Sequence, residues 1–222
     1  METERNNLVA GAEALQEQLR HAYWIGGGSG AGKSTIARRI VAERGLQLYA
    51  TDDVMPAHAR RSTPESCPFL HEFMAMDMDE RWVNRSPKAM LETFHWFRGE
   101  GFSMIIEDVL RLAKEPGVIV DGLRLLPHLV KPLLAVRCHA VWLLPTPEFR
   151  QAVFDSRGGP QWGFIGKTSN PQRALRNVLE RDAMFTHQLY EEAKRLEMNI
   201  IPVDATMTVD DLTSRVTEVF GL

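Results

Sequence analysis

The sequence lacks several features that would assign the chain to a particular class. Among 222 residues there are only two cysteines, Cys67 and Cys138, and their spacing fits no metal-binding pattern. We expect both to be reduced packing residues of an unsecreted protein, with a single disulfide between them as the alternative. The sequence also has no internal repeat and no low-complexity segment.

Long apolar runs and blocks of basic residues are missing too. No stretch of about 18 uninterrupted apolar residues occurs, so we expect no membrane span. Residues 1–5 are polar and acidic, unlike a signal peptide. The net charge of −3, without a basic block, argues against a nucleic-acid partner. We therefore expect a cytoplasmic protein of unknown oligomeric state, with no membrane or nucleic acid as partner.

What the sequence does contain is a phosphate-binding loop pattern, G-x-x-x-x-G-K-[ST], at residues 27–34. Its glycines allow consecutive backbone N–H groups to surround a phosphate. Lys33 can reach the β- and γ-phosphate oxygens, and the Ser34 hydroxyl can coordinate Mg²⁺. The candidate nucleotide-binding residues are Gly27, Gly28, Ser29, Gly30, Ala31, Gly32, Lys33, Ser34 and Thr35.

The surroundings of this loop support the pattern. Residues 23–25 form a short aromatic and β-branched run typical of a buried strand. Residues 34–44 place Ile36, Ile40 and Val41 at helical spacing, and Gly45 follows. The order strand, loop, helix is the one that a phosphate loop requires; the alternative is a glycine-rich linker beside a helix.

The rest of the chain predicts an α/β fold. Further apolar, β-prone runs occur at residues 46–50, 118–122, 140–144 and 199–203, separated by helical patterns. Five short apolar strands between helices indicate a parallel sheet covered on both faces. We expect one domain over residues 1–222. Within it we expect an N-terminal helix in 1–22, a helical substrate-facing insertion at 54–114 and a mobile loop at 155–169. A long helix starts at Asn170-Pro171, and the last helix covers 209–220.

Carboxylates follow two of these strands. Asp52 and Asp53 come after the second strand, and Asp121 ends the third. Because ligands of an open parallel sheet lie beyond the carboxyl ends of its strands, these groups can accept a proton from a substrate hydroxyl or hold Mg²⁺. The alternatives are that the Asp pair caps the next helix and that Asp121 is a turn residue.

Basic side chains are candidates for contacts with phosphates. Arg157, in the glycine-rich loop, can close over a nucleotide and stabilise the transferring group, ahead of Arg173 and Arg176 in the next helix. Arg60 and Arg124 are candidate substrate-binding residues, as is Asp53, although solvent exposure explains the arginines equally well. The aromatic run 94–97, with Trp82, is either a pocket lining or, as we prefer, the core of the insertion.

Three segments together resemble the P-loop kinases of small molecules, a group that includes nucleoside and nucleoside monophosphate kinases, chloramphenicol phosphotransferases, zeta toxins and 2-phosphoglycerate kinases. The segments are residues 27–35, the strand end 49–53, and 118–124, which is similar to strand ends of uridine and adenylate kinases. The resemblance implies a parallel sheet of order 2-3-1-4-5, ATP with Mg²⁺ as phosphoryl donor, and a lid near Arg157. It also favours Asp52 over Asp53 as the base. Arg124 lies one place closer to Gly122 than the arginine of adenylate kinases.

The sequence thus predicts an ATP-dependent kinase acting on a hydroxyl of a small-molecule acceptor. Lys33, Asp52 and Arg157 are the expected catalytic residues, and Ser34 with Asp121 the expected Mg²⁺ ligands. The alternatives are an NTPase switch and a nucleotide-binding module without turnover. The acceptor stays open among nucleosides, sugars and antibiotic-like molecules.

Overall fold

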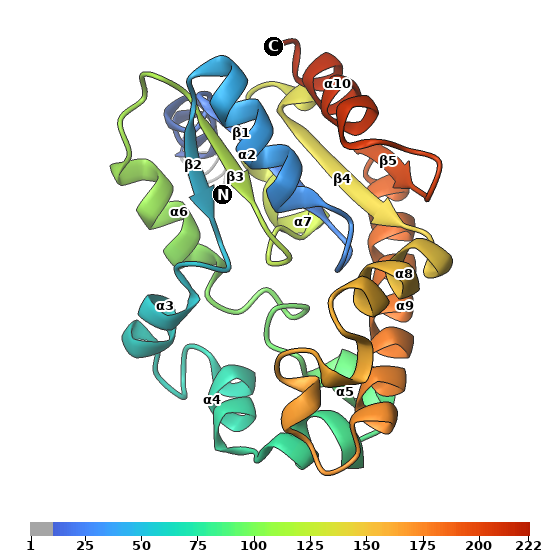
Figure 1. Cartoon of the computed structure of the whole chain (residues 1–222). Coiled ribbons are helices and arrows are strands. Elements are labelled where there is room, and N and C mark those ends of the chain that lie inside the picture. The colour runs from blue at the N-terminus through green and yellow to red at the C-terminus, as the bar shows by residue number, and fades with distance from the viewer. Residues whose placement is uncertain (1–10) are drawn as a thin grey trace.

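A computed structural model describes residues 11–222 of the chain. Its sheet has five parallel strands in the order β2-β3-β1-β4-β5, which confirms the α/β fold and the order 2-3-1-4-5 (Figure 1). The strands are β1 (Ala22–Gly27), β2 (Gln47–Ala50), β3 (Val118–Asp121), β4 (Ala140–Pro145) and β5 (Asn199–Val203). All five strand predictions are confirmed to within a residue or two at their ends.

Helices connect the strands. The α-helices are α2 (Lys33–Arg44), α3 (Met55–Arg61), α4 (Pro68–Ala75), α5 (Pro87–Thr93), α6 (Phe102–Arg111), α7 (Pro127–Val130), α8 (Pro147–Ser156), α9 (Pro171–Arg195) and α10 (Val209–Phe220). Short turns of other helix types are η1 (Glu80–Asn84), η2 (Lys131–Leu133), η3 (Arg137–His139), η4 (Gly159–Gln161) and η5 (Ile165–Lys167). Residues 11–18 are also helical, whereas the first ten residues of the predicted N-terminal helix lie outside the described part of the chain.

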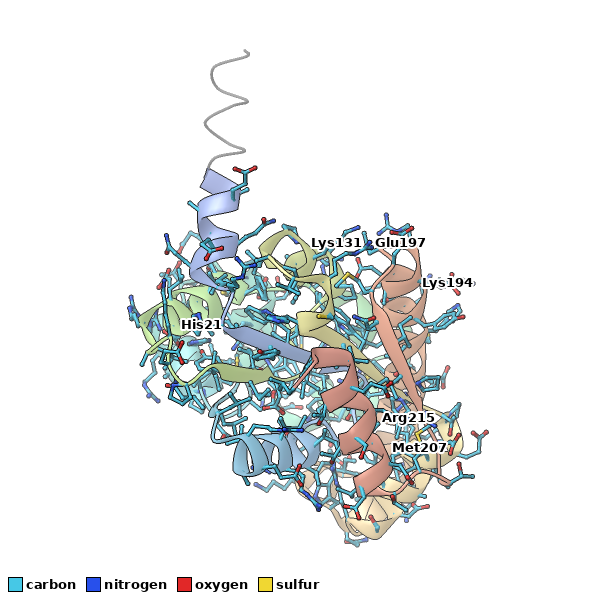
Figure 2. All side chains as sticks on the ribbon, turned by 90° about the horizontal axis from the view of Figure 1, so that it is seen from above. His21, Lys131, Lys194, Glu197, Met207 and Arg215 are labelled. Atoms are coloured by element: carbon cyan, nitrogen blue, oxygen red, sulfur yellow. The ribbon has the colours of Figure 1, made fainter. Side chains whose placement is uncertain are left out.

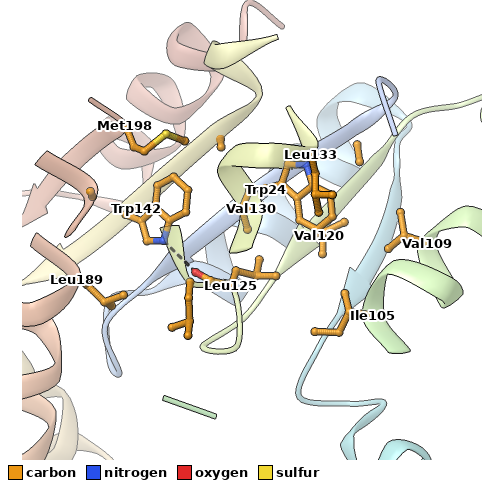
Figure 3. Close-up of a cluster of buried hydrophobic side chains, with 14 of the residues drawn as sticks. Trp24, Ile105, Val109, Val120, Leu125, Val130, Leu133, Trp142, Leu189 and Met198 are labelled. Carbon is orange, nitrogen blue, oxygen red and sulfur yellow. Dashed lines mark hydrogen bonds between the residues drawn. The ribbon is translucent and has the colours of Figure 1, made fainter. Parts of the chain in front are cut away.

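Two apolar cores lie on opposite faces of the sheet. On one face, Ile36 and Ile40 of α2 pack with Val216 of α10 against the strands. On the other face, Trp24 and Trp142 of the sheet are packed among side chains of α6, α7 and α9 (Figure 3). Because both faces are covered, the strands carry the near-continuous apolar runs seen in the sequence.

Trp142 shows how the second core accommodates a polar group. Its side chain is fully buried, and its indole N–H donates a hydrogen bond of 2.9 Å to the carbonyl oxygen of Leu125 (Figure 3). A buried indole N–H needs such a partner. The bond ties the loop after β3 to β4, on the sheet face covered by α9.

The segment between β2 and β3 forms the helical lobe that the sequence predicts. Helices α3, α4 and α5 lie beyond the carboxyl ends of the strands, and α9 runs from the sheet alongside this lobe (Figure 1). A third apolar cluster joins Trp82 and Phe94 of the lobe to Phe154 of α8 and Leu175 of α9. The lobe is thus held against α8 and α9 by aromatic packing.

The prediction of a loop at residues 155–169 is wrong in part. Helix α8 extends through Ser156, and two 3₁₀ turns, η4 and η5, follow it. Gly158, Gly159 and Gly163 have φ angles of 111°, 53° and 50°, in the region that favours glycine. The glycines therefore form tight turns of a compact connection to α9.

Two further observations concern the whole of residues 11–222. Cys67 and Cys138 are both free thiols, as the favoured prediction has it. Over this same range, every helix is too short or too polar to cross a bilayer.

Candidate active site

The phosphate loop connects the buried end of β1 to the start of α2. Gly28 N–H donates to the carbonyl oxygen of Leu143 in β4 at 2.9 Å, which fixes the loop to the sheet. A side chain at Gly27 is impossible, since its Cβ would lie 2.0 Å from that same carbonyl oxygen. Helix α2 begins at Lys33 without an acidic residue in its first turn, so its free N–H groups and dipole favour an anion there.

Lys33 lies within this loop. Its side chain is buried, and Nζ donates to the carbonyl oxygens of Gly27 and Gly28 at 3.2 and 2.7 Å. Burial lowers the pKa of Lys33 to about 8, an effect opposed by the nearby carboxylates of Asp52, Asp121 and Asp182. An anionic group at the loop would favour the charged ammonium.

Ser34 and Asp121 meet directly beside the loop. Ser34 Oγ donates to Asp121 Oδ2 at 2.6 Å, across β1 and β3, whose register pairs Ile25 with Asp121. Asp121 is 1% exposed, and burial raises the pKa of its carboxyl group. Its second oxygen, Oδ1, is buried without a hydrogen-bond partner among residues 11–222. A hydroxyl next to a carboxylate with a spare oxygen is a donor set that suits Mg²⁺.

Gly122 keeps Asp121 next to Thr51. The φ angle of Gly122 is 153°, and a Cβ there would lie 1.7 Å from Thr51 Oγ1. Thr51 N–H donates to the Asp121 carbonyl oxygen at 2.9 Å. The backbone of β2 therefore passes close to the end of β3, and the carboxylates after the two strands lie at one edge of the sheet.

The Asp pair after β2 does not cap the next helix. Val54 is the N-cap of α3, which has no side-chain cap. Asp52 is exposed, accepts a long hydrogen bond of 3.4 Å from Thr51 Oγ1, and lines a cavity. Asp53 is exposed as well and is not part of that lining. Asp52 thus lines the cavity, and Asp53 does not.

A cavity of about 690 Å³ extends from the phosphate loop into the helical lobe. Ser29 and Asp52 line it at the sheet, and Arg157 at the end of α8 lines it as well. The rest of its wall includes seven aromatic side chains, which come from the lobe, from α8 and from the segment after α8: Phe73, Trp82, Phe94, Trp96, Phe154, Trp162 and Phe164. The sequence left two alternatives for the aromatic residues, a pocket lining and the core of the insertion. In the structure they are both, because they pack against one another and also line the cavity.

The predicted basic residues fall into two groups. Arg157 is exposed, lies 5.2 Å from the ring centroid of Trp162, and is close enough to lower the pKa of Lys33. By contrast, Arg124 is 1% exposed and bonded to His58 Nδ1 and the Gly101 carbonyl oxygen, while Arg60 is exposed; neither lines the cavity. Burial thus corrects the expectation that Arg124 is available to a substrate or solvent.

Three buried polar residues of the cavity wall were not assigned a role from the sequence. Arg181 and Asp182 are consecutive on α9, both buried, and Arg181 donates from Nε and Nη2 to Asp182 Oδ1 at 2.9 and 2.7 Å. His95 is 4% exposed, with Nδ1 unpaired among the described residues. An adjacent Arg-Asp pair on a long helix usually faces solvent, so the sequence carries no signal that this one is buried.

The opposite edge of the sheet carries no comparable arrangement among the described residues. Figure 2 looks onto this edge and labels His21 beside the start of β1, Lys131 on the connection before β4, and Glu197 on the connection before β5. These side chains are far from the phosphate loop. The phosphate loop, Asp52 and Asp121 lie instead at the carboxyl ends of β1, β2 and β3.

Comparison with known proteins yields matches in structure only. No protein-family model matches the sequence, and no curated protein does. Among solved structures, an uncharacterized protein from Eubacterium ventriosum is 14% identical with a TM-score of 0.47, covering 90% of this chain and 97% of its own. Shikimate kinase from Acinetobacter baumannii, in complex with shikimate, is 16% identical with a TM-score of 0.44, covering 89% and 91%.

Deoxyadenosine kinase from M. mycoides, with bound dATP, is 13% identical with a TM-score of 0.47, covering 90% of this chain and 99% of its own. At such identities the likeness concerns the fold alone. The phosphate loop and the strand order 2-3-1-4-5 are features of this chain's own structure and do not depend on these matches.

Proposed function

We propose that this protein is an ATP- and Mg²⁺-dependent phosphotransferase that moves the γ-phosphoryl group of ATP to a hydroxyl of a small-molecule acceptor. One observation carries the proposal: the phosphate loop and Asp52 open into the same cavity of about 690 Å³. A switch or a passive nucleotide binder has no need of a second compartment beside the phosphates. In this proposal residues 1–222 form one kinase domain, 54–114 bind the acceptor, and 155–169 act as the lid.

The nucleotide phosphates would be bound by the chain's own backbone. The N–H groups of residues 28–33 and the start of α2 offer donors to the β-phosphate. Lys33 Nζ, now bonded to Gly27 and Gly28 carbonyl oxygens, would exchange these for β- and γ-phosphate oxygens. Binding an anion there would raise the lowered pKa of Lys33 and keep the ammonium charged.

Ser34 and Asp121 are the residues that would hold Mg²⁺. Asp121 Oδ1, which has no partner among residues 11–222, supports this role, because a buried carboxylate oxygen without a donor needs a cation or a donor nearby. Mg²⁺ would supply neutralisation of negative charge on the phosphate oxygens.

Asp52 is positioned to act on the acceptor. In the transfer step its carboxylate takes the proton of the acceptor hydroxyl while a bond forms between that oxygen and the γ-phosphorus. The bond from phosphorus to the bridging oxygen breaks, and ADP leaves with its electron pair. Arg157, at the end of α8, would stabilise the charge of the transferring group. Asp53, Arg60 and Arg124 have no part in this proposal.

The test is Mg²⁺-dependent ADP release across a panel of nucleosides, nucleotides, sugar acids and aminoglycoside-type antibiotics. We expect release with at least one acceptor class and none when Mg²⁺ is chelated. ADP release that needs no acceptor and is stimulated by a protein partner would instead favour an NTPase switch. Silence across the panel would count against a phosphotransferase.

A further inference from the structure

The far wall of the cavity has the properties of a ring-binding site. Trp82 and Phe94 of the helical lobe and Phe164 after α8 line it, and their side chains contact one another. Aromatic walls bind flat apolar bodies by stacking and edge contacts. A ring-free polyol would leave this surface unmatched.

A neutral ion pair lies beside these rings. Arg181 is bonded to Asp182 through two N–H groups, and its guanidinium carbon lies 4.6 Å from the ring centroid of Phe94 and 5.3 Å from that of Trp82. The side chains of the pair are 5% and 2% exposed. Because each charge neutralises the other, this part of the wall has no excess charge to offer an ion.

The pair also has unused hydrogen-bonding capacity. Arg181 Nη1 and Asp182 Oδ2 are buried without partners among residues 11–222, although both residues line the cavity. Leaving a buried donor or acceptor unpaired costs free energy. A ligand that offers an acceptor to Nη1 and a donor to Oδ2 would recover this free energy.

Arg81, another charged residue of the wall, is already bonded to carbonyl oxygens of the protein. Arg81 donates from Nε and Nη2 to the carbonyl oxygens of Phe73 and Met74, at the C-terminal end of α4. An anion at the ion pair would also face the Asp182 carboxylate. The wall therefore suits a neutral group better than a carboxylate or phosphate.

Resting on the proposed function, we propose that the acceptor is a neutral hydroxyl compound with a flat ring whose edge carries a hydrogen-bond acceptor beside a donor. The ring lies among the aromatic side chains, Arg181 Nη1 donates to the acceptor atom, and Asp182 Oδ2 accepts from the donor. The hydroxyl arm extends toward Asp52. Arg181 and Asp182 thus select the acceptor and take no part in the transfer step.

Direct binding tests this proposal without turnover, because Trp82, Trp96 and Trp162 line the cavity and report binding by fluorescence. The probes are uridine and guanosine, whose rings carry an N–H beside a carbonyl oxygen. Their matched controls are N3-methyluridine and N1-methylguanosine, in which that N–H is blocked. Ribose lacks the flat heteroaromatic ring, and gluconate is an open-chain anion.

We expect uridine or guanosine to bind at least about 10-fold more tightly than its methylated counterpart, the value of one lost hydrogen bond of about 1.4 kcal/mol. Ribose and gluconate should bind more weakly still. Equal binding of the blocked nucleosides, tighter binding of gluconate, or failure of both nucleosides would overturn the proposal. These measurements use the wild-type chain and do not depend on how a variant folds.

Substitutions test whether Arg181 and Asp182 are the residues that bind the edge of the ring. Arg181→Met keeps the stem that packs on the rings, and Asp182→Asn keeps the shape of the carboxylate; each should reduce the preference for the unblocked nucleoside to below about 2-fold. Arg195→Met, an exposed arginine in the last turn of the same helix, should leave it unchanged. Retained preference in folded Arg181→Met and Asp182→Asn would contradict the proposal.

A separate measurement distinguishes this inference from the proposed function. The rise in melting temperature with Mg²⁺-ATP reports the nucleotide site, and Lys33→Ala should abolish it. If ATP stabilises the wild type and not Lys33→Ala, yet the ring probes fail, only the acceptor class is wrong. If ATP does not raise the melting temperature of the wild type, the proposed function itself is wrong.

Discussion

Lys33 and Asp52 belong to the same edge of the sheet but have different surroundings. Lys33 is buried and bonded to two loop carbonyl oxygens, whereas Asp52 is exposed to the cavity and held by a single long hydrogen bond. A buried, preorganised charge acts more strongly on a developing charge than an exposed one. The two residues should therefore contribute unequally to the reaction.

This difference leads to a prediction on rates. Lys33→Ala should lower kcat/KM by about 10³-fold or more, since it removes the cation at the transferring group. Asp52→Asn should cost less, about 10–100-fold, because a loose transition state needs little help from a base. The measurement is initial-rate ADP release with the acceptor found in the panel.

Controls for this comparison lie on distant parts of the molecule. Lys131→Ala, near the opposite edge of the sheet, and Asp210→Asn, an exposed residue of α10, should change the rate less than about 2-fold. Equal rates for wild type and Lys33→Ala would falsify the assignment of the phosphate loop.

His95 leads to a prediction on stability. Burial and the charges of Arg124, Arg181 and Arg81 lower its pKa from 6.5 to about 3. As the pH falls below about 6.5, the unfolded chain takes up a proton at this residue and the folded protein does not. The stability contribution is therefore complete above pH 6.5 and is lost progressively down to about pH 3, by up to about 1.4 kcal/mol per pH unit.

Urea unfolding between pH 7 and pH 5 measures this effect. His95→Gln should show a shallower loss of unfolding free energy than the wild type over that range. His128→Gln is the matched control, because this histidine is exposed on α7 and paired with Glu192. Identical pH slopes for wild type and His95→Gln would contradict a buried neutral imidazole.

At the scale of elements, the active edge depends on how closely β2 and β3 approach each other. A Cβ at Gly122 would lie 1.7 Å from Thr51 Oγ1. Thr51 is the first residue after β2 and precedes Asp52, and Gly122 is the first residue after β3 and follows Asp121. The contact is between strands that are far apart in the sequence. Any side chain at position 122 would push the two strand ends apart.

Gly122→Ala should accordingly destabilise the protein by about 3 kcal/mol or more, through overpacking together with an unfavourable φ angle. Gly45→Ala is the control, since Gly45 has a φ angle of 67° but nothing within 4 Å of its added Cβ. That variant should cost about 1 kcal/mol, the strain of a left-handed residue alone. Denaturant midpoints of the two variants give the comparison; similar values would mean that the close approach is unimportant.

At the scale of the whole molecule, two compartments share one cavity. The sheet supplies the phosphate loop, whereas the lobe and the segment after α8 supply the aromatic wall. Helix α9 contacts both compartments, because its side chains belong both to the core on one face of the sheet and to the aromatic cluster of the lobe. A ligand at the phosphate loop should consequently stabilise the fold as a unit.

Mg²⁺-ATP at about 100 times its Kd should add about 2.7 kcal/mol to the unfolding free energy. For a chain of this size that corresponds to a rise in melting temperature of about 5–10 °C. Thermal unfolding followed by circular dichroism measures it, with Lys33→Ala as the variant that should not respond. No shift at millimolar ATP would rule out a nucleotide site of ordinary affinity.

Local patterns by themselves determined the strands, the long helices and the phosphate loop. Each of these depends on residues close in the chain: alternating or continuous apolar runs, proline and serine at helix starts, glycines where the backbone turns. The loop 155–169 was the exception, because glycine and proline also occur in compact 3₁₀ turns.

The tertiary structure alone decided which charged side chains are enclosed. Arg124 is bonded inside the molecule and Arg181 with Asp182 lines the cavity, although their sequence surroundings resemble those of exposed residues. Burial of a charge depends on which segments pack around it, and those segments are up to about a hundred residues away. For the same reason, the sequence alone could not show that Phe94 and Trp96 line a cavity, because this depends on how α8 and α9 pack against the lobe.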